Sequence, residues 1–159
     1  MAYLKWDQAG ERVYEVGVKK VALYLFDSSN ENPYSNGVAW NGVTNITEKP
    51  TGAEENALWA DDIKYASLRS TEEFEASIEA FTYPDEFAQC DGSAEIVVGI
   101  TIGQQARKTF GLAYITTKGN DTDNLDYGYK VHIIYGATAS PSEKQHETIN
   151  TLHDSDSRC

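Results

Sequence analysis

Basic side chains are scarce in this chain of 159 residues, which has 13 Lys and Arg against 25 Asp and Glu and a formal net charge of −12. Proteins that bind duplex DNA specifically use Lys and Arg to neutralise phosphates. The charge therefore argues against such a domain, and we expect any contact with nucleic acid to be repulsive. At this length we expect one domain whose core needs no metal or disulfide to fold.

Cysteines and long apolar runs are also rare. The cysteines are Cys90 and Cys159, which match neither a disulfide framework nor a zinc or redox motif, so we expect free thiols in a reducing compartment. No run approaches the roughly 20 apolar residues of a membrane span, and the N-terminus lacks the basic and apolar regions of a signal peptide. The sequence predicts a protein made in the cytoplasm, with no membrane partner.

Residues suited to acid–base or nucleophilic chemistry are few. The histidines are His132, His146 and His153. There is no Gly-x-Ser-x-Gly elbow, no His-Glu-x-x-His motif and no phosphate-binding loop ending in Lys-Ser or Lys-Thr. Asp121, Asp123 and Asp126 lack EF-hand spacing and are typical of a turn rich in Asx side chains. We expect no enzyme activity, no cofactor and no metal, and we expect His132 to be solvated or in a contact between subunits.

Alternation of apolar and polar side chains is the main pattern that is present. From Tyr129 to Tyr135 the odd positions are apolar, while Lys130 and His132 lie on the other face, which is typical of a half-buried strand. Similar patterns predict strands at residues 21–26, 96–102 and 110–114. The turn-rich connections between them are too short for βαβ crossovers. The sequence therefore predicts a mainly β protein with antiparallel strands.

The segment 71–83 fits two structures. Its apolar residues at Phe74, Ile78 and Phe81 have helical spacing, but residues 73–80 also alternate fully between acidic or polar and apolar side chains. We favour a strand, because a short helix fits better directly after it. Pro84 suits a first helical position, and the Asp91-Gly92 pair suits the end of one or two turns.

Three tryptophans lie in polar, turn-rich segments. Trp6, Trp40 and Trp59 could each pack in the core or anchor a protein contact, because aromatic side chains suit both roles. The chain becomes polar after Ala137. We expect residues 1–144 to form the folded domain and residues 145–159 to be a loosely held polar tail.

Several blocks of the sequence, in order, resemble the major tail (tail tube) proteins of long-tailed, siphovirus-type bacteriophages and prophages. The N-terminal blocks are 1–8 (Met-Ala-Tyr-Leu-Lys-Trp-Asp-Gln), 10–12, 37–42 (Gly-Val-Ala-Trp-Asn-Gly) and 60–65 (Ala-Asp-Asp-Ile-Lys-Tyr). The later blocks are 78–87, 90–95, 102–105, 107–111, 126–130 and 139–144. The resemblance covers about nine-tenths of the chain and ends after Lys144, where family members continue with a further strand-like segment.

The resemblance implies a β-sandwich or barrel-like tail tube fold with one short flanking α-helix. Six subunits would form a ring in which each contributes strands to a continuous inner β-barrel. Stacked rings would form a tube in the virion that encloses the tape measure protein and conducts double-stranded DNA during ejection. Its other partners would be the tail terminator and distal tail proteins. The function would be structural, without catalysis.

Candidate site residues follow from this expectation. We expect the acidic face of the 71–83 segment, with Glu73, Glu75 and Glu79, to line the bore. Candidate subunit or ring contacts are Trp6, Tyr34, Trp40 and Trp59. Two alternatives remain open: a tube subunit of a phage-derived particle or injection system, and a monomeric β-sandwich binding module that uses Trp40 and Trp59 as a stacking platform.

Overall fold

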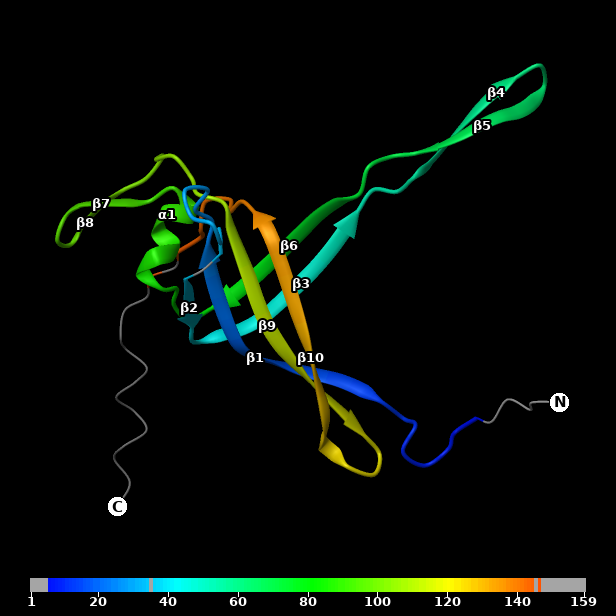
Figure 1. Ribbon diagram of the computed structural model, residues 1–159, viewed down its shortest axis with the longest axis horizontal. Coiled ribbons are helices and arrows are strands. Elements are labelled where there is room, and N and C mark those ends of the chain that lie inside the picture. The colour runs from blue at the N-terminus through cyan, green and yellow to red at the C-terminus, as the bar shows by residue number, and fades with distance from the viewer. Residues whose placement is uncertain (1–5, 35, 145, 147–159) are drawn as a thin grey trace.

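A computed structural model describes residues 6–34, 36–144 and 146 of the chain (Figure 1). It is mainly β, with 56% of the residues in strands and one short helix, and its sheets are antiparallel. The predicted mainly β class is therefore confirmed. No sheet formed by the described residues closes into a barrel. The predicted polar tail, 145–159, lies outside the described residues except for His146.

Four strands form the largest sheet, which we call sheet A. Its strands are β1 (Tyr14–Leu25), β2 (Gly37–Trp40), β9 (Phe110–Asn120) and β10 (Asn124–Ala137), in the spatial order β10-β9-β1-β2. All three pairings are antiparallel, with Leu23 opposite both Val38 and Leu112. The strands expected at 21–26, 110–114 and 129–135 lie within β1, β9 and β10.

Three further strand pairs complete the fold. They are β3 (Val43–Thr51) with β6 (Glu73–Ala80), β4 (Glu55–Ala60) with β5 (Ile63–Arg69), and β7 (Ala94–Val97) with β8 (Ile100–Ile102). The strand interpretation of the 71–83 segment is thus confirmed. The single strand expected at 96–102 is wrong, because a turn at Val98-Gly99, with φ of +85° at Gly99, divides it into a hairpin.

The short helix lies where the sequence places it. A 3₁₀ turn, η1 (Asp85–Phe87), leads into α1 (Ala88–Asp91), and Gly92 ends the helix in the left-handed conformation with φ of 84°. Pro84 has extended backbone angles and lies one residue before the first helical residue, Asp85, and not at the first helical position as expected. The 3₁₀ turn directs Phe87 into the core, and the helix directs Cys90 into it.

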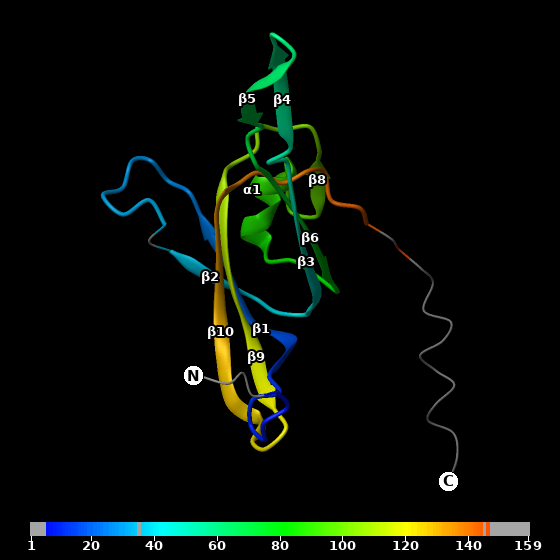
Figure 2. The same ribbon diagram turned by 90° about the vertical axis from the view of Figure 1, so that its right-hand side faces the viewer.

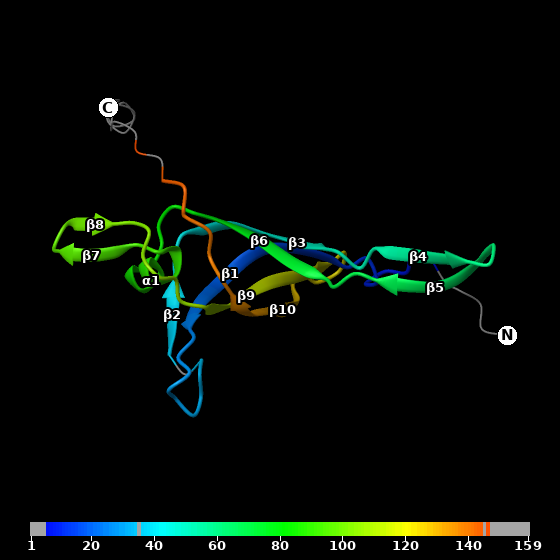
Figure 3. The ribbon, with the colours of Figure 1, turned by 90° about the horizontal axis from the view of Figure 1, so that it is seen from above.

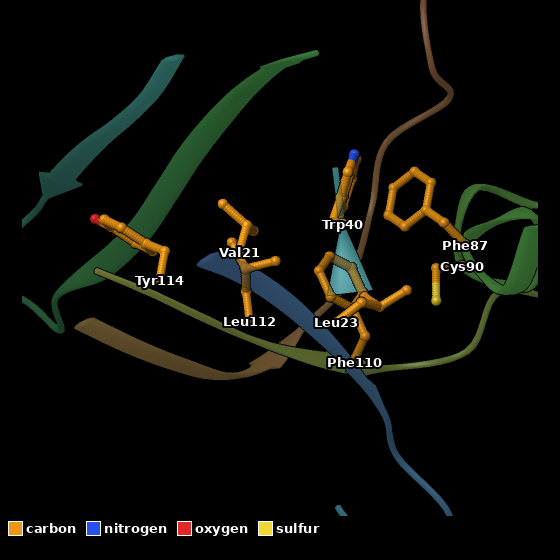
Figure 4. Packing of buried hydrophobic residues seen from close by; sticks show 8 residues of the cluster. All are labelled: Val21, Leu23, Trp40, Phe87, Cys90, Phe110, Leu112 and Tyr114. Atoms are coloured by element: carbon orange, nitrogen blue, oxygen red, sulfur yellow. The ribbon is translucent and has the colours of Figure 1, made fainter. Parts of the chain in front are cut away.

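The core is small and consists of eight buried side chains (Figure 4). They are Val21, Leu23, Trp40, Phe87, Cys90, Phe110, Leu112 and Tyr114. Phe87 joins the helix to the sheet, because its ring lies 4.8 Å from that of Trp40 and 5.6 Å from that of Phe110. Ile46 and Ile78 pack against this cluster from the β3–β6 pair. One face of sheet A is therefore covered by α1 and β3–β6 (Figure 2).

The other face of sheet A is largely uncovered by the described residues, apart from its end at Gly111, where the Tyr34 side chain lies against it. Tyr129, Val131, Ile133 and Tyr135 are exposed on β10, whereas His132 and Ile134 turn toward the covered face. The alternation of apolar and polar residues thus predicted the strand β10. Its apolar face, however, is exposed, whereas an apolar face normally packs on the core. His132 is half-buried, and its ring stacks on that of Tyr114 at 4.6 Å within the same chain.

Two hairpins project from opposite ends of the molecule (Figures 1 and 3). We call β4–β5, residues 55–69, the arm, and β7–β8, residues 94–102, the finger. Neither contributes a side chain to the core cluster. The molecule is therefore much longer than its core, with exposed ribbon at both ends.

Candidate functional site

The three candidate bore residues lie on β6 of the β3–β6 pair. Glu73, Glu75 and Glu79 are opposite Thr51, Lys49 and Asn45 of β3. All three carboxylates are exposed. They share one face of the strand, because side chains alternate, and Ile78 on the other face packs against the core. The structure therefore places the acidic face away from sheet A; its facing the bore remains a prediction.

Two of the four candidate contact residues are on the surface. The side chain of Trp6 is 80% exposed, and that of Trp59 on β4 is 70% exposed. Trp59 belongs to the arm, where Ile63, Tyr65 and Leu68 are also more than half exposed. A role for these tryptophans in contacts between copies stays a prediction.

The other two candidate contact residues are used within the chain. Trp40 is only 6% exposed, and its Nε1 donates a hydrogen bond to the Thr82 carbonyl at 2.8 Å. Tyr34 is half-buried, and its hydroxyl accepts a bond from the Gly136 amide at 3.0 Å. Trp40 is therefore a core residue, which corrects its assignment as a contact and removes the stacking platform proposed with Trp59.

The arm is a surface that the sequence reading did not single out. Its two strands are joined by Asp61-Asp62, both with positive φ (51° and 59°), as in the two-residue turns that suit the twist of a hairpin. The pattern in the sequence that could have predicted this hairpin is a pair of segments with mixed apolar and polar residues on either side of Asp61-Asp62. It was missed because Asn-Gly or Asp-Gly is the usual mark of such a turn.

The finger is the second missed surface. Its exposed side chains are almost all aliphatic: Ile96, Val97, Val98, Ile100 and Ile102. Val98 at the tip is 94% exposed. The Glu95 carboxylate accepts a bond from the Gly99 amide at 2.8 Å and so stabilises the turn. Exposed apolar clusters of this kind mark protein contacts.

The long edge of sheet A is a third candidate surface. β10 has 14 residues and is the outermost strand, and nothing among the described residues pairs with its outer side. On its open face, Val131 and Ile133 lie opposite Ile115 and Ala113 of β9. A long unpaired edge beside exposed apolar side chains is suited to pairing with another chain.

A cluster of polar side chains connects β1, β9 and β10 on the side of sheet A toward which His132 points. The Glu15 carboxylate accepts a hydrogen bond from Thr116 Oγ1 at 2.6 Å and lies 3.1 Å from His132 Nε2 and 3.6 Å from Lys130 Nζ. The Thr116 hydroxyl is the main cause that lowers the pKa of Glu15 below its ordinary value of 4.5, assisted by His132 and Lys130. This cluster therefore stabilises the sheet when Glu15 is ionised.

Two ionisable side chains of the core have raised pKa values. Burial is the main cause for Tyr114, and its hydroxyl also donates a hydrogen bond to the Glu48 carboxylate. Burial, with the neighbouring Asp91 charge, raises the pKa of Cys90 to about 11. At neutral pH the Cys90 thiol is therefore protonated, buried and poorly reactive, which suits a packing role.

The acidic turn at 121–126 is built from its own hydrogen bonds. Asp121 Oδ1 accepts a bond from the Gly10 amide, and Asp123 Oδ2 accepts one from the Asn120 side chain. Among the residues that the structure describes, no group of three or more His, Cys, Asp or Glu side chains could hold a metal ion. Within the same residues, no helix is long and apolar enough to span a membrane.

The chain is thus a mainly β, antiparallel protein with a small core and three exposed surfaces: the β10 edge, the arm and the finger. Comparison with known proteins finds no match among family models, curated proteins or solved structures.

Proposed function

We propose that this chain is the subunit of a bacteriophage tail tube, in which six copies form a ring and rings stack into a tube. The support from the sequence is the ordered set of blocks that resemble major tail proteins. The function is structural, in the virion, and no reaction is catalysed. The same reasoning suits a tube of a phage-derived particle or injection system, which the neighbouring genes would distinguish.

The observation that supports assembly most strongly is the free edge of β10. This strand has 14 residues, the full length of sheet A, and four exposed apolar or aromatic side chains on its open face. Monomeric proteins usually protect such edges with charges, proline or a covering segment. Pairing of β10 with a strand of the next copy would satisfy its backbone groups, and closing a ring of copies would leave no free edge.

The negative charge suits the passage of DNA. Six copies of −12 give a formal charge of −72 per ring. Duplex DNA has one negative charge per about 1.7 Å, so a bore lined with carboxylates repels it and lets it slide. We assign Glu73, Glu75 and Glu79 to this bore. The tape measure protein would occupy the same bore before ejection, and the terminator and distal tail proteins would bind at the two ends.

Electron microscopy of the purified chain tests assembly directly. Negative-stain images and size-exclusion chromatography over a concentration series should show rings or tubes, with six-fold symmetry in end views. A compact monomer at every concentration would contradict the proposal and favour a binding module, for which Trp59, unlike Trp40, is exposed.

The bore assignment has its own test. Replacing Glu75 and Glu79 with Lys should leave tubes largely intact, because both side chains are exposed, but should slow DNA ejection from virions. The physical reason is that the lysines attract phosphates that the carboxylates repel. A matched control replaces Glu31 and Glu54, which lie outside β6, with Lys. If the β6 variant ejects DNA as fast as the control, the bore assignment is wrong.

A further inference from the structure

The finger and the arm project from opposite ends of the molecule (Figure 1). A pocket lies at the base of the finger. It has a volume of about 440 Å³ and is open to solvent. Its walls come from β8 and the loop after it, from the end of α1, and from the segment that follows β10. The residues that line it include Asp91, Thr101, Ile102, Arg107 and Lys144.

The pocket is basic, although the whole chain is strongly acidic. Arg107 and Lys144 line it together with one acid, Asp91, which is nearly buried and accepts a bond from the Ser93 amide. Arg107 Nε donates to the Asp91 carbonyl, and Lys144 lies over the Tyr83 ring at 5.2 Å. Neither cation forms a salt bridge with any residue that the structure describes.

The tip of the arm has the complementary chemistry. Asp61 and Asp62 form its turn, are exposed, and have no ion-pair partner among the described residues. Trp59 and Ile63 flank the turn and are largely exposed. The tip thus combines two carboxylates with a large apolar surface, and the pocket combines two cations with the aliphatic side chains of the finger, Ile102 and Ile100.

One chain cannot join these two surfaces, because the arm and the finger lie at opposite ends of its long axis (Figures 1 and 3). We propose that the arm tip of one copy binds the basic pocket and the finger of a second copy. The contact is heterologous, because each copy contributes its arm tip to one neighbour and its pocket and finger to another. Repetition of a heterologous contact makes rings or filaments. This proposal rests on the proposed function in that the second copy is the next subunit of the tube.

A charge swap tests the electrostatic part. Asp61→Lys with Asp62→Lys should raise the concentration needed for assembly about tenfold, and Arg107→Asp with Lys144→Asp should do the same. The four substitutions together should restore assembly to within about threefold of the unaltered chain, because the charges are complementary again. Circular dichroism checks the fold of each variant. A simple folding defect would not be rescued by the combination, so failure of rescue overturns the ion pairing.

Cysteine cross-linking tests the geometry. In a Cys159→Ser background, with Cys90 left in place because it is fully buried, Ala60→Cys and Thr101→Cys should give a ladder of oxidised oligomers. Ala60→Cys with Thr122→Cys, on the distant β9–β10 turn, is the control. Ordered tubes with no more cross-linking than the control overturn this contact but leave the proposed function standing.

The two proposals fail in different ways. A cross-linked ladder without rings or tubes would support the arm–pocket contact and contradict the tail tube. A chain that stays monomeric at all concentrations and gives no ladder would contradict both.

Discussion

The ionised side chain of Glu15 lies among polar groups of sheet A. It lies on β1 and reaches across β9 to His132 and Lys130 on β10, so it connects three strands. Its lowered pKa means that the ionised form is favoured in the folded state. The resulting stabilisation is complete above the ordinary value of 4.5 and is lost as the pH falls through the lower folded-state value.

We predict that Glu15→Gln destabilises the chain at pH 7, and that the difference from the unaltered chain narrows as the pH falls below 4.5. Urea unfolding at a fixed protein concentration, followed at pH 7, 5, 4 and 3, measures this. Glu31→Gln is the control, because Glu31 is exposed and has no side-chain hydrogen bond or ion pair among the described residues. A constant difference between Glu15→Gln and the unaltered chain at every pH would contradict the pKa argument.

The fate of individual side chains was only partly predictable. Nothing in the sequence distinguishes Trp40, which is buried, from Trp59, which is exposed, since both lie in short strands beside polar residues. What separates them is tertiary: Trp40 lies on the edge strand of sheet A, within reach of Phe87, whereas Trp59 lies on a hairpin that projects from the body. The alternation of residues shows which side chains share a face of a strand, but it does not show which of the two faces packs on the core.

At the scale of elements, Gly52 controls how the arm leaves the body. It follows β3 and has φ of +97°, and a Cβ there would meet the Thr71 carbonyl oxygen at 2.4 Å. Both conditions disfavour any other residue. The arm therefore depends on this glycine for its connection to the β3–β6 pair.

We predict that Gly52→Ala loosens the base of the arm by roughly 1–3 kcal/mol, the usual cost of such backbone strain. The Ser70 amide, which donates to the Glu54 carbonyl at 3.1 Å, should exchange its hydrogen about tenfold faster or more. Gly128→Ala is the matched control, because a Cβ there meets nothing within 4 Å and its φ is unstrained. Equal exchange at Ser70 in the two variants would contradict this role of Gly52.

Four of the ten strands, β1, β6, β9 and β10, and the short helix could be predicted, whereas β2 to β5 were not and the β7–β8 hairpin was expected as one strand. The strand at 73–80 and the helix after Pro84 follow from local pattern and capping. The finger was predicted as one strand because apolar residues alternate from Ile96 to Ile102, and the sequence does not show the positive φ of Gly99 that makes the turn. The arm was missed because its turn is Asp-Asp, a sequence that does not by itself signal a hairpin.

At the scale of the whole molecule, the free edge of β10 predicts a change in hydrogen exchange on assembly. In the monomer, the β10 amides that point away from β9 should exchange quickly, while the β9 amides, which lie between two strands, should exchange slowly. In tubes the outward β10 amides should slow by at least tenfold and β9 should change little. Fast exchange of the β10 amides in ordered tubes would show that another edge joins the copies.

The arm has a further consequence for the timing of assembly. It is a two-stranded ribbon away from the core, and an isolated two-stranded hairpin in water is marginally stable at best. A free subunit therefore spends part of its time with the arm frayed, and the first contacts between copies must order it. Growth onto an existing end starts from ordered neighbours. If the chain forms tubes as we propose, their growth should begin with a lag that preformed seeds abolish.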